Sequence, residues 1–148
     1  MTVTKTRSDA GLATGLRISV SRLARRLRVE RQAEGLASLS DTQLAALAVL
    51  DRHGAMTPGE LAEHEKVQPP SMTRVIAVLE ERRLVMRAPH ATDRRQVVLT
   101  VTEQGRELVS QARRRRDAWL AKRLKELSPE ERAILRTAAP VLEKLSQA

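Results

Sequence analysis

Residues 57–102 read TPGELAEHEKVQPPSMTRVIAVLEERRLVMRAPHATDRRQVVLTVT, and the fold that we expect for the chain follows from this stretch. It opens with a capping signal, because Thr57 and Glu60 can exchange bonds that satisfy backbone donors at a helix start. The helix must be short, because Pro69 and Pro70 follow and a prolyl ring disfavours helical geometry in the preceding residue. The same two prolines suit the first turn of a second helix.

The second helix is expected to have one apolar face and one exposed polar end. Its apolar residues recur at helical spacing and predict the buried side: Met72, Val75, Ile76 and Leu79. Two helices joined by so short a turn are typical of a helix-turn-helix, whose second helix meets base edges with its N-terminal residues. We therefore predict DNA contacts from the start of this helix, at Pro69, Pro70, Ser71, Thr73 and Arg74.

The polar side chains at this end also have interpretations that involve no DNA. Arg74 could pair within the helix with Glu80 or Glu81, but neither lies three or four positions away, so a DNA contact is favoured. Ser71 and Thr73 could bond base edges or phosphates, or they could cap the helix. The sequence leaves both of these possibilities open.

A two-stranded ribbon is expected directly after the second helix. Residues 84–88 (LVMRA) and 96–100 (QVVLT) are its strands, and the polar residues 89–95 form the tip between them. Asp93 is expected to support this wing, by bonding loop amides or by pinning one guanidinium. Arg94 and Arg95 are then candidates for DNA contact, because a narrow minor groove attracts arginine.

Several short motifs together resemble the winged helix-turn-helix of the MarR family of transcriptional regulators. They are SMTR at 71–74, LEERRLV at 79–85, DRR at 93–95, and LT at 99–100 followed by Gly105. With the flanking helices, the resemblance covers nearly the whole chain. It implies a homodimer whose second helices lie in the major groove and whose wing arginine, here Arg95, enters the minor groove. The chain departs from the family at Arg83, where Gly is usual, and at Ala77-Val78, a pair that is often charged.

The remaining helices are expected to hold two copies together. Amphipathic patterns predict one helix near residues 10–33, a scaffold helix from Ser40 to His53, and two helices at 103–126 and after Ser128. Their apolar faces are larger than a compact winged-helix core can cover, which indicates association. We therefore predict a single mainly α domain over 1–148, with a DNA-binding lobe at about 36–102 that carries the small β-wing. Dimerisation helices are expected at about 10–35 and 103–146.

The resemblance also implies a small-molecule effector, because many family members bind anionic aromatic compounds between the dimer helices and the DNA-binding lobe. Arg17 and His53 are the candidate ligand-binding residues, by their expected positions at that junction. His53, His64 and His90 share no metal-ligand spacing, so no metal and no cofactor are expected.

Composition narrows the classes of protein that fit. The chain has 148 residues and no cysteine, which excludes disulfides, thiolate metal sites and thiol redox sensing. It contains neither a signal peptide nor an apolar run of the roughly 18 residues that cross a bilayer, so a cytoplasmic protein without membrane contact is expected. A phosphate-binding glycine loop, a zinc motif and a nucleophile with a nearby base are also absent, which argues against an enzyme.

The formal net charge of +9 is carried mostly by arginine and suggests a nucleic-acid partner, although a GC-rich genome also enriches arginine. We therefore predict a sequence-specific, dimeric DNA-binding regulator of transcription, and we favour a repressor over an activator. It would bind a pseudo-palindromic operator and leave it when the effector binds. The alternative is a non-specific architectural DNA-binding protein, which the charge also permits.

Overall fold

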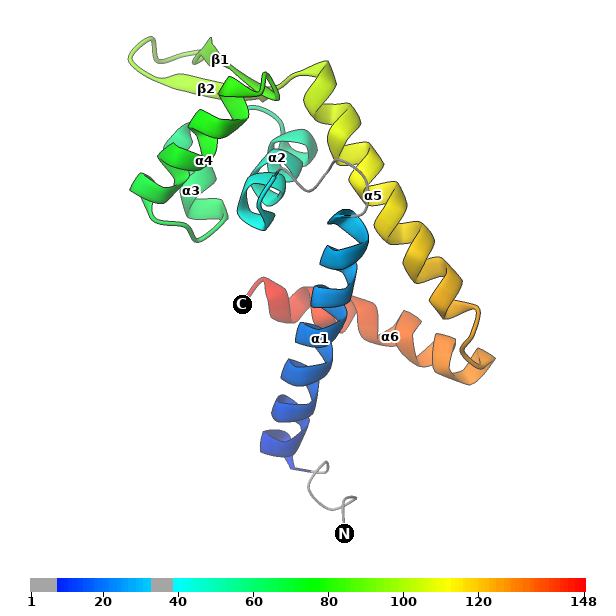
Figure 1. Cartoon of the computed structure of the whole chain (residues 1–148). Coiled ribbons are helices and arrows are strands. Elements are labelled where there is room, and N and C mark those ends of the chain that lie inside the picture. Colours follow the sequence, from blue (N-terminus) through cyan, green and yellow to red (C-terminus); the bar gives the residue numbers. More distant parts are fainter. Residues whose placement is uncertain (1–7, 33–38) are drawn as a thin grey trace.

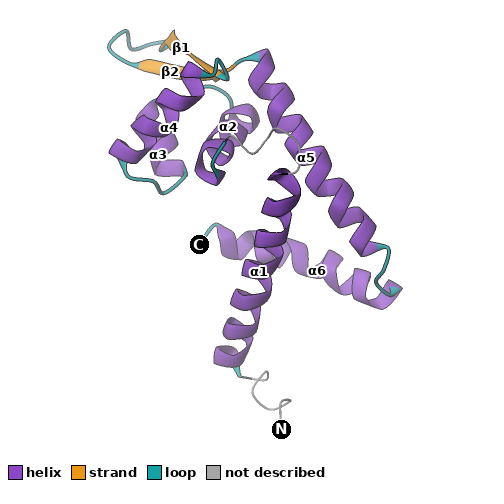
Figure 2. Cartoon of the chain, viewed as in Figure 1, coloured by secondary structure: helices purple, strands orange, loops and turns teal. Residues whose placement is uncertain are grey.

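The computed structural model describes residues 8–32 and 39–148, and these residues form six helices and two strands (Figure 1). Their order is α1 (Asp9–Gln32), α2 (Asp41–His53), α3 (Pro58–His64), α4 (Pro69–Glu81), β1 (Val85–Pro89), β2 (Val97–Val101), α5 (Glu103–Leu124) and α6 (Pro129–Ser146). Helices dominate, and the two strands are confined to one hairpin (Figure 2). The expected fold class, mainly α with a small β-wing, is confirmed. The expected end of the first helix, at about residues 33–35, and the expected start of the lobe at about residue 36 lie outside the described residues.

Local capping explains where most helices begin. Ser40 and Gln43 form a full capping box at α2, with bonds of 3.1 and 3.0 Å, and Ser128 and Glu131 form another at α6. At α3 only half of the expected box forms, because Thr57 Oγ1 accepts from the following turn but receives no carboxylate in return. The expectation of reciprocal bonds there was wrong, since the partner carboxylate is exposed and water can solvate it.

The core lies in the lobe built by α2, α3, α4 and the hairpin, and the N-terminal half of α5 packs onto it. Helix α2 is its scaffold and packs against α4, α5 and β2. The largest fully buried side chains are Leu47, Leu61, Met72, Ile76, Leu79, Leu99 and Val109. The predicted apolar face of the second helix is therefore confirmed as buried, and its opposite side is left on the surface.

The hairpin is antiparallel and begins one residue later than predicted. Val85 pairs with Val101 and Pro89 with Val97. Leu84 is not in the ladder, because its N–H donates to Leu79 O at 2.9 Å and closes the helix instead. The segment before α3 adds only an isolated bridge from Met56 to β2.

Two helices end in left-handed residues that are not glycine. Arg83 follows α4 with φ 57°, and its N–H donates to Glu80 O at 2.9 Å. With the bond from Leu84 N, this is a Schellman motif, as expected for the position at which Arg83 replaces glycine. Lys66 adopts φ 55° after α3, which the sequence did not signal. Gly54 is the C-cap of α2 with φ 84°, a backbone that glycine adopts without strain, and its N–H donates to Leu50 O at 3.0 Å.

Helix α5 contributes Val109 and Ala112 to the lobe core, whereas α1 and α6 contribute none of its buried residues. Helix α5 runs from the hairpin past α2 and α1, and α6 crosses the middle of α1 at the far end of the molecule (Figure 1). None of the residues of α6 is buried. No described helix is both long enough and apolar enough to cross a bilayer.

Candidate nucleic-acid interface

The N-terminal end of α4 presents the residues that the sequence predicted. Pro69, Pro70, Ser71, Thr73 and Arg74 are all exposed. The two prolines have no N–H and Met72 N donates to Gln68 O, so Ser71 carries the one N–H of this first turn that bonds to no described residue. An N–H at a helix start, with the helix dipole behind it, suits an anion such as a phosphate.

The two hydroxyl groups on this surface behave differently. Thr73 Oγ1 donates to Pro69 O at 2.9 Å, so its hydrogen is used within the helix while its lone pairs stay open. Ser71 does not cap the helix, because the N-cap residue is Gln68 and no side-chain cap bond forms there. The capping role that the sequence left open for both residues is therefore not observed.

Arg74 is available for an outside partner. Its side chain makes no hydrogen bond or ion pair with any described residue. Glu80, one of its conceivable partners, pairs with Arg87 instead, with N–O distances of 2.8 to 3.0 Å. This pair ties β1 to α4, and the hydrogen bond with Glu80 raises the pKa of Arg87. Sequence reasoning missed it, because the two residues are neighbours only after the chain reverses into the hairpin.

At the wing tip, Asp93 is hydrogen-bonded within the loop, whereas the side chains of Arg94 and Arg95 are exposed. Asp93 Oδ1 accepts a hydrogen bond from Arg95 N at 3.0 Å, so the expected bond to a loop amide forms. The Arg95 side chain is 96% exposed, and its Nε lies 4.0 Å from the same oxygen. Arg94 is exposed as well. His90, which the sequence left without a role, accepts two further loop amides.

Thr102 connects this lobe to α5. Its hydroxyl donates to Arg83 O at 2.7 Å and accepts from Gly105 N at 3.1 Å, while its N–H donates to Leu84 O at 3.0 Å. A Cβ on Gly105 would collide with the Leu84 carbonyl oxygen. The left-handed end of α4 and the first turn of α5 are therefore held against each other.

The two candidate ligand-binding residues lie in different surroundings. Arg17 lines a hollow between α1 and α6, whereas the His53 ring lies 5.1 Å from that of His64 in the lobe. A separate cavity of about 290 Å³ opens between α1, α2 and α5. Its lining includes the guanidinium-bearing residues Arg28 and Arg116, which the sequence did not single out.

Comparison with known proteins shows which family the sequence and the fold are similar to. Residues 39–97 match the MarR family. An HTH-type transcriptional regulator of Mycobacterium bovis is 54% identical over 135 residues, 91% of this chain and 92% of that protein. The HTH-type transcriptional repressor MdtR of Bacillus subtilis is 33% identical over 110 residues, 74% of this chain and 69% of its own. The fold is similar to that of Streptococcus pneumoniae FabT in complex with DNA, with TM-score 0.76 and 20% identity over 92% of this chain and 96% of FabT.

Proposed function

The chain belongs to the MarR family, and we propose that it is a dimeric regulator that binds a specific DNA duplex and represses transcription. The observation that carries the proposal is that Arg74 and Arg95 lie exposed on one lobe, on α4 and on the wing tip, while the buried face of α4 fixes its orientation. The repressor among the relatives, MdtR, supports the direction of regulation. We assign no enzymatic role, and a regulator of bacterial genes would act in the cytoplasm.

The charge of the lobe favours recognition of a sequence over general coating of DNA. Residues 36–102 contain eight Lys and Arg and eight Asp and Glu, so the formal net charge of the lobe is zero although the whole chain carries +9. Non-specific affinity rises with the number of phosphates that cations neutralise. A nearly balanced lobe with a few exposed arginines therefore fits a specific interface better than an architectural one.

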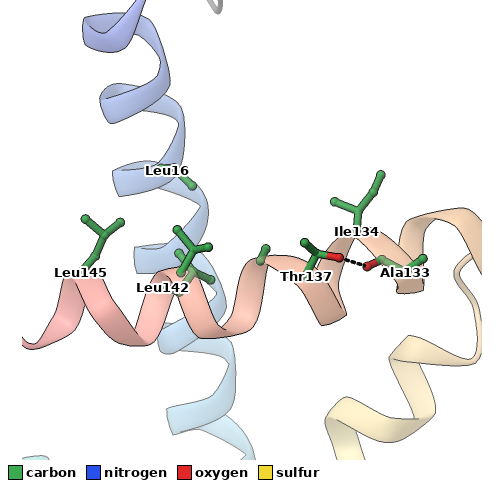
Figure 3. A pocket seen from close by; sticks show the side chains of 8 residues that line it. Leu16, Ala133, Ile134, Thr137, Leu142 and Leu145 are labelled. Atoms are coloured by element: carbon green, nitrogen blue, oxygen red, sulfur yellow. Dashed lines mark hydrogen bonds between the residues drawn. The ribbon is translucent and has the colours of Figure 1, made fainter.

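Dimerisation is proposed from the apolar side chains that the single chain leaves uncovered. They lie on α1 and α6 and include Leu12, Val20, Leu23, Ile134, Val141 and Leu145. An open apolar hollow of about 580 Å³ lies along α6, where Ile134, Leu142 and Leu145 project from the same side of the helix (Figure 3). Exposed apolar surface of this extent marks association, and a second copy would supply the same face.

A twofold dimer would set two copies of α4 about one DNA turn apart, as a pseudo-palindromic operator requires. An effector that binds better to a dimer with a different spacing would lower DNA affinity by shifting the population. We propose the cavity between α1, α2 and α5 for this effector, because Arg116 can attract an anion there, beside the ion pair that Arg28 forms with Asp41 at 3.4 Å. Arg17 and His53, which were predicted from the sequence as effector-binding residues, do not line this cavity, and each remains a separate proposal for a contact with the effector.

Selection of bound duplexes from a random pool tests the function. We expect a pseudo-palindrome whose half-site centres are about 10 base pairs apart. The affinity for random DNA should be lower than the affinity for this sequence by a factor of about a thousand or more. Recovery of unrelated sequences with equal affinity would contradict the proposal and favour the architectural alternative.

A further inference from the structure

One imidazole holds the tip of the wing together. His90 lies directly after β1, half-buried, and its Nδ1 accepts backbone hydrogen bonds from Thr92 N at 3.2 Å and Asp93 N at 3.0 Å. A neutral ring that accepts at Nδ1 carries its hydrogen on Nε2. The ring thus does what an Asn or Asp oxygen does in an Asx turn, where it accepts an N–H two residues on.

Further bonds lead from this ring to the exposed arginine. Asp93 O accepts from Gln96 N at 3.1 Å, and His90 N donates to Gln96 O at 3.2 Å, which closes the loop at its base. The Asp93 carboxylate in turn accepts from Arg95 N. The backbone on both sides of Asp93 is therefore fixed, while the guanidinium of Arg95 stays in solvent.

We propose that His90 is a positioning residue for DNA recognition, whose neutral imidazole orders the wing tip and holds Arg95 ready to enter a groove. The inference rests on the proposed function, because it concerns the contact between wing and DNA. Without the acceptor, the N–H groups of Thr92 and Asp93 would turn to water and the tip would sample more conformations. DNA binding would then have to order that backbone, which weakens affinity.

The test compares a variant that keeps an acceptor with one that removes it. His90→Asn offers an oxygen in an Asx turn, whereas His90→Leu offers none; each is made with Arg95 intact and in Arg95→Ala. Fluorescence anisotropy with a duplex from the random-pool selection gives the affinities. We expect His90→Leu to bind about fivefold to thirtyfold more weakly and His90→Asn to stay within about twofold of the starting protein.

The Arg95→Ala background decides whether His90 acts through the arginine. There, His90→Leu should cause little further loss, because residues that act as a unit are not additive. If His90→Asn binds as weakly as His90→Leu, or if the losses from His90→Leu and Arg95→Ala add in full, the proposal is overturned. Thr92→Ala is the matched control: it removes the hydroxyl 3.4 Å from the ring but keeps the bonded N–H, so near-normal affinity is expected.

Amide hydrogen exchange on the free protein separates this inference from the proposed function. The amides of Thr92 and Asp93 should be protected with His90 or Asn at the position and lose protection in His90→Leu. Unchanged protection in His90→Leu overturns the positioning role whatever the DNA result. If no duplex is selected although these amides respond as expected, the proposed function fails and the wing geometry stands.

Discussion

At the scale of single residues, what matters is which arginines already have a partner. Arg87 is held by Glu80, so its contribution is to the fold. The pKa of Arg87 is raised by this partner. The contribution of the pair to the free energy of unfolding is therefore fully present below the pKa of Arg87 in the unfolded chain, and it is lost only as pH rises through the pKa of Arg87 in the folded protein. It therefore adds no pH dependence near neutrality. Arg74 makes no such bond to a described residue, so its side chain is open for the DNA contact that we propose.

Arg74→Ala should weaken binding to the selected duplex by about 1–3 kcal/mol, because a bidentate contact to a base is of that order. Fluorescence anisotropy measures the change. Arg22→Ala is the control, because Arg22 is also exposed but lies on α1, and this variant should bind DNA with the affinity of the starting protein. Equal affinities for Arg74→Ala and Arg22→Ala would remove the role given to Arg74.

Arg95→Ala should reduce the slope of the logarithm of DNA affinity against the logarithm of salt concentration by about 1, because the protein would then neutralise about one phosphate charge fewer. Titrations at several salt concentrations measure this slope. Arg25→Ala, an exposed arginine on α1, serves as the control. An unaltered slope for Arg95→Ala would mean that the wing tip does not approach the duplex.

Arg83 carries a left-handed backbone that L side chains adopt at a cost. Arg83→Gly should therefore raise the free energy of unfolding by about 0.5–1 kcal/mol, after the greater freedom of glycine in the unfolded chain is offset. Denaturant unfolding measures the change. Ala77→Gly, at an exposed position inside α4, is the opposing control and should destabilise by about 1 kcal/mol. If Arg83→Gly instead lowers the free energy of unfolding, the Arg83 side chain stabilises the protein by more than its left-handed backbone costs.

At the scale of elements, the joint between the hairpin and α5 links the DNA-binding lobe to the outer helices. Thr102 bonds the end of α4 through Arg83 O and caps α5 through Gly105 N. A displacement of α5 would therefore be transmitted to α4 through short bonds. Such a connection is what an effector between α1, α2 and α5 would need in order to alter DNA binding.

Gly105→Ala should destabilise the protein by about 1–3 kcal/mol, because its Cβ would meet the Leu84 carbonyl and Val101 in a packed joint. Thermal and denaturant unfolding measure the loss. Gly15→Ala is a matched control within α1, where an added Cβ has nothing within 4 Å, and it should be neutral or stabilising. Equal stability of the two variants would show that the joint can relax.

At the scale of the whole molecule, the apolar faces of α1 and α6 decide the assembly. Helix α6 has no buried residue, although its apolar residues recur in a stripe from Ile134 to Leu145. A helix with this pattern gains most of its stability from packing of the apolar face. The second copy that we propose would supply that packing.

Val141→Lys should shift the protein toward monomers and weaken DNA binding, because a charge would enter the proposed interface. Sedimentation equilibrium measures the assembly. Met86→Lys is the matched control: Val141 and Met86 are both 57% exposed, but Met86 lies on β1, away from α6. An unchanged assembly of Val141→Lys would place the interface elsewhere, and a monomeric starting protein would contradict the dimer itself.

The sequence by itself determined the elements whose signals are local. The capping boxes at Ser40 and Ser128, the prolines that open α4, and the apolar spacing from Met72 to Leu79 each depend on neighbours within a turn or two. The exposed end of α4 and the Asp93 bond at the wing tip were predictable for the same reason. Short-range bonds and helical periodicity do not need the rest of the chain.

Only the tertiary structure decided the features that join distant segments. Thr102 meets Arg83 across 19 positions, and Arg87 meets Glu80 after the chain has reversed direction. The cavity that contains Arg28 and Arg116 exists because α1, α2 and α5 converge there. No spacing rule predicts such contacts, because they depend on the packing of whole elements, and packing is set by the buried surfaces of all of them together.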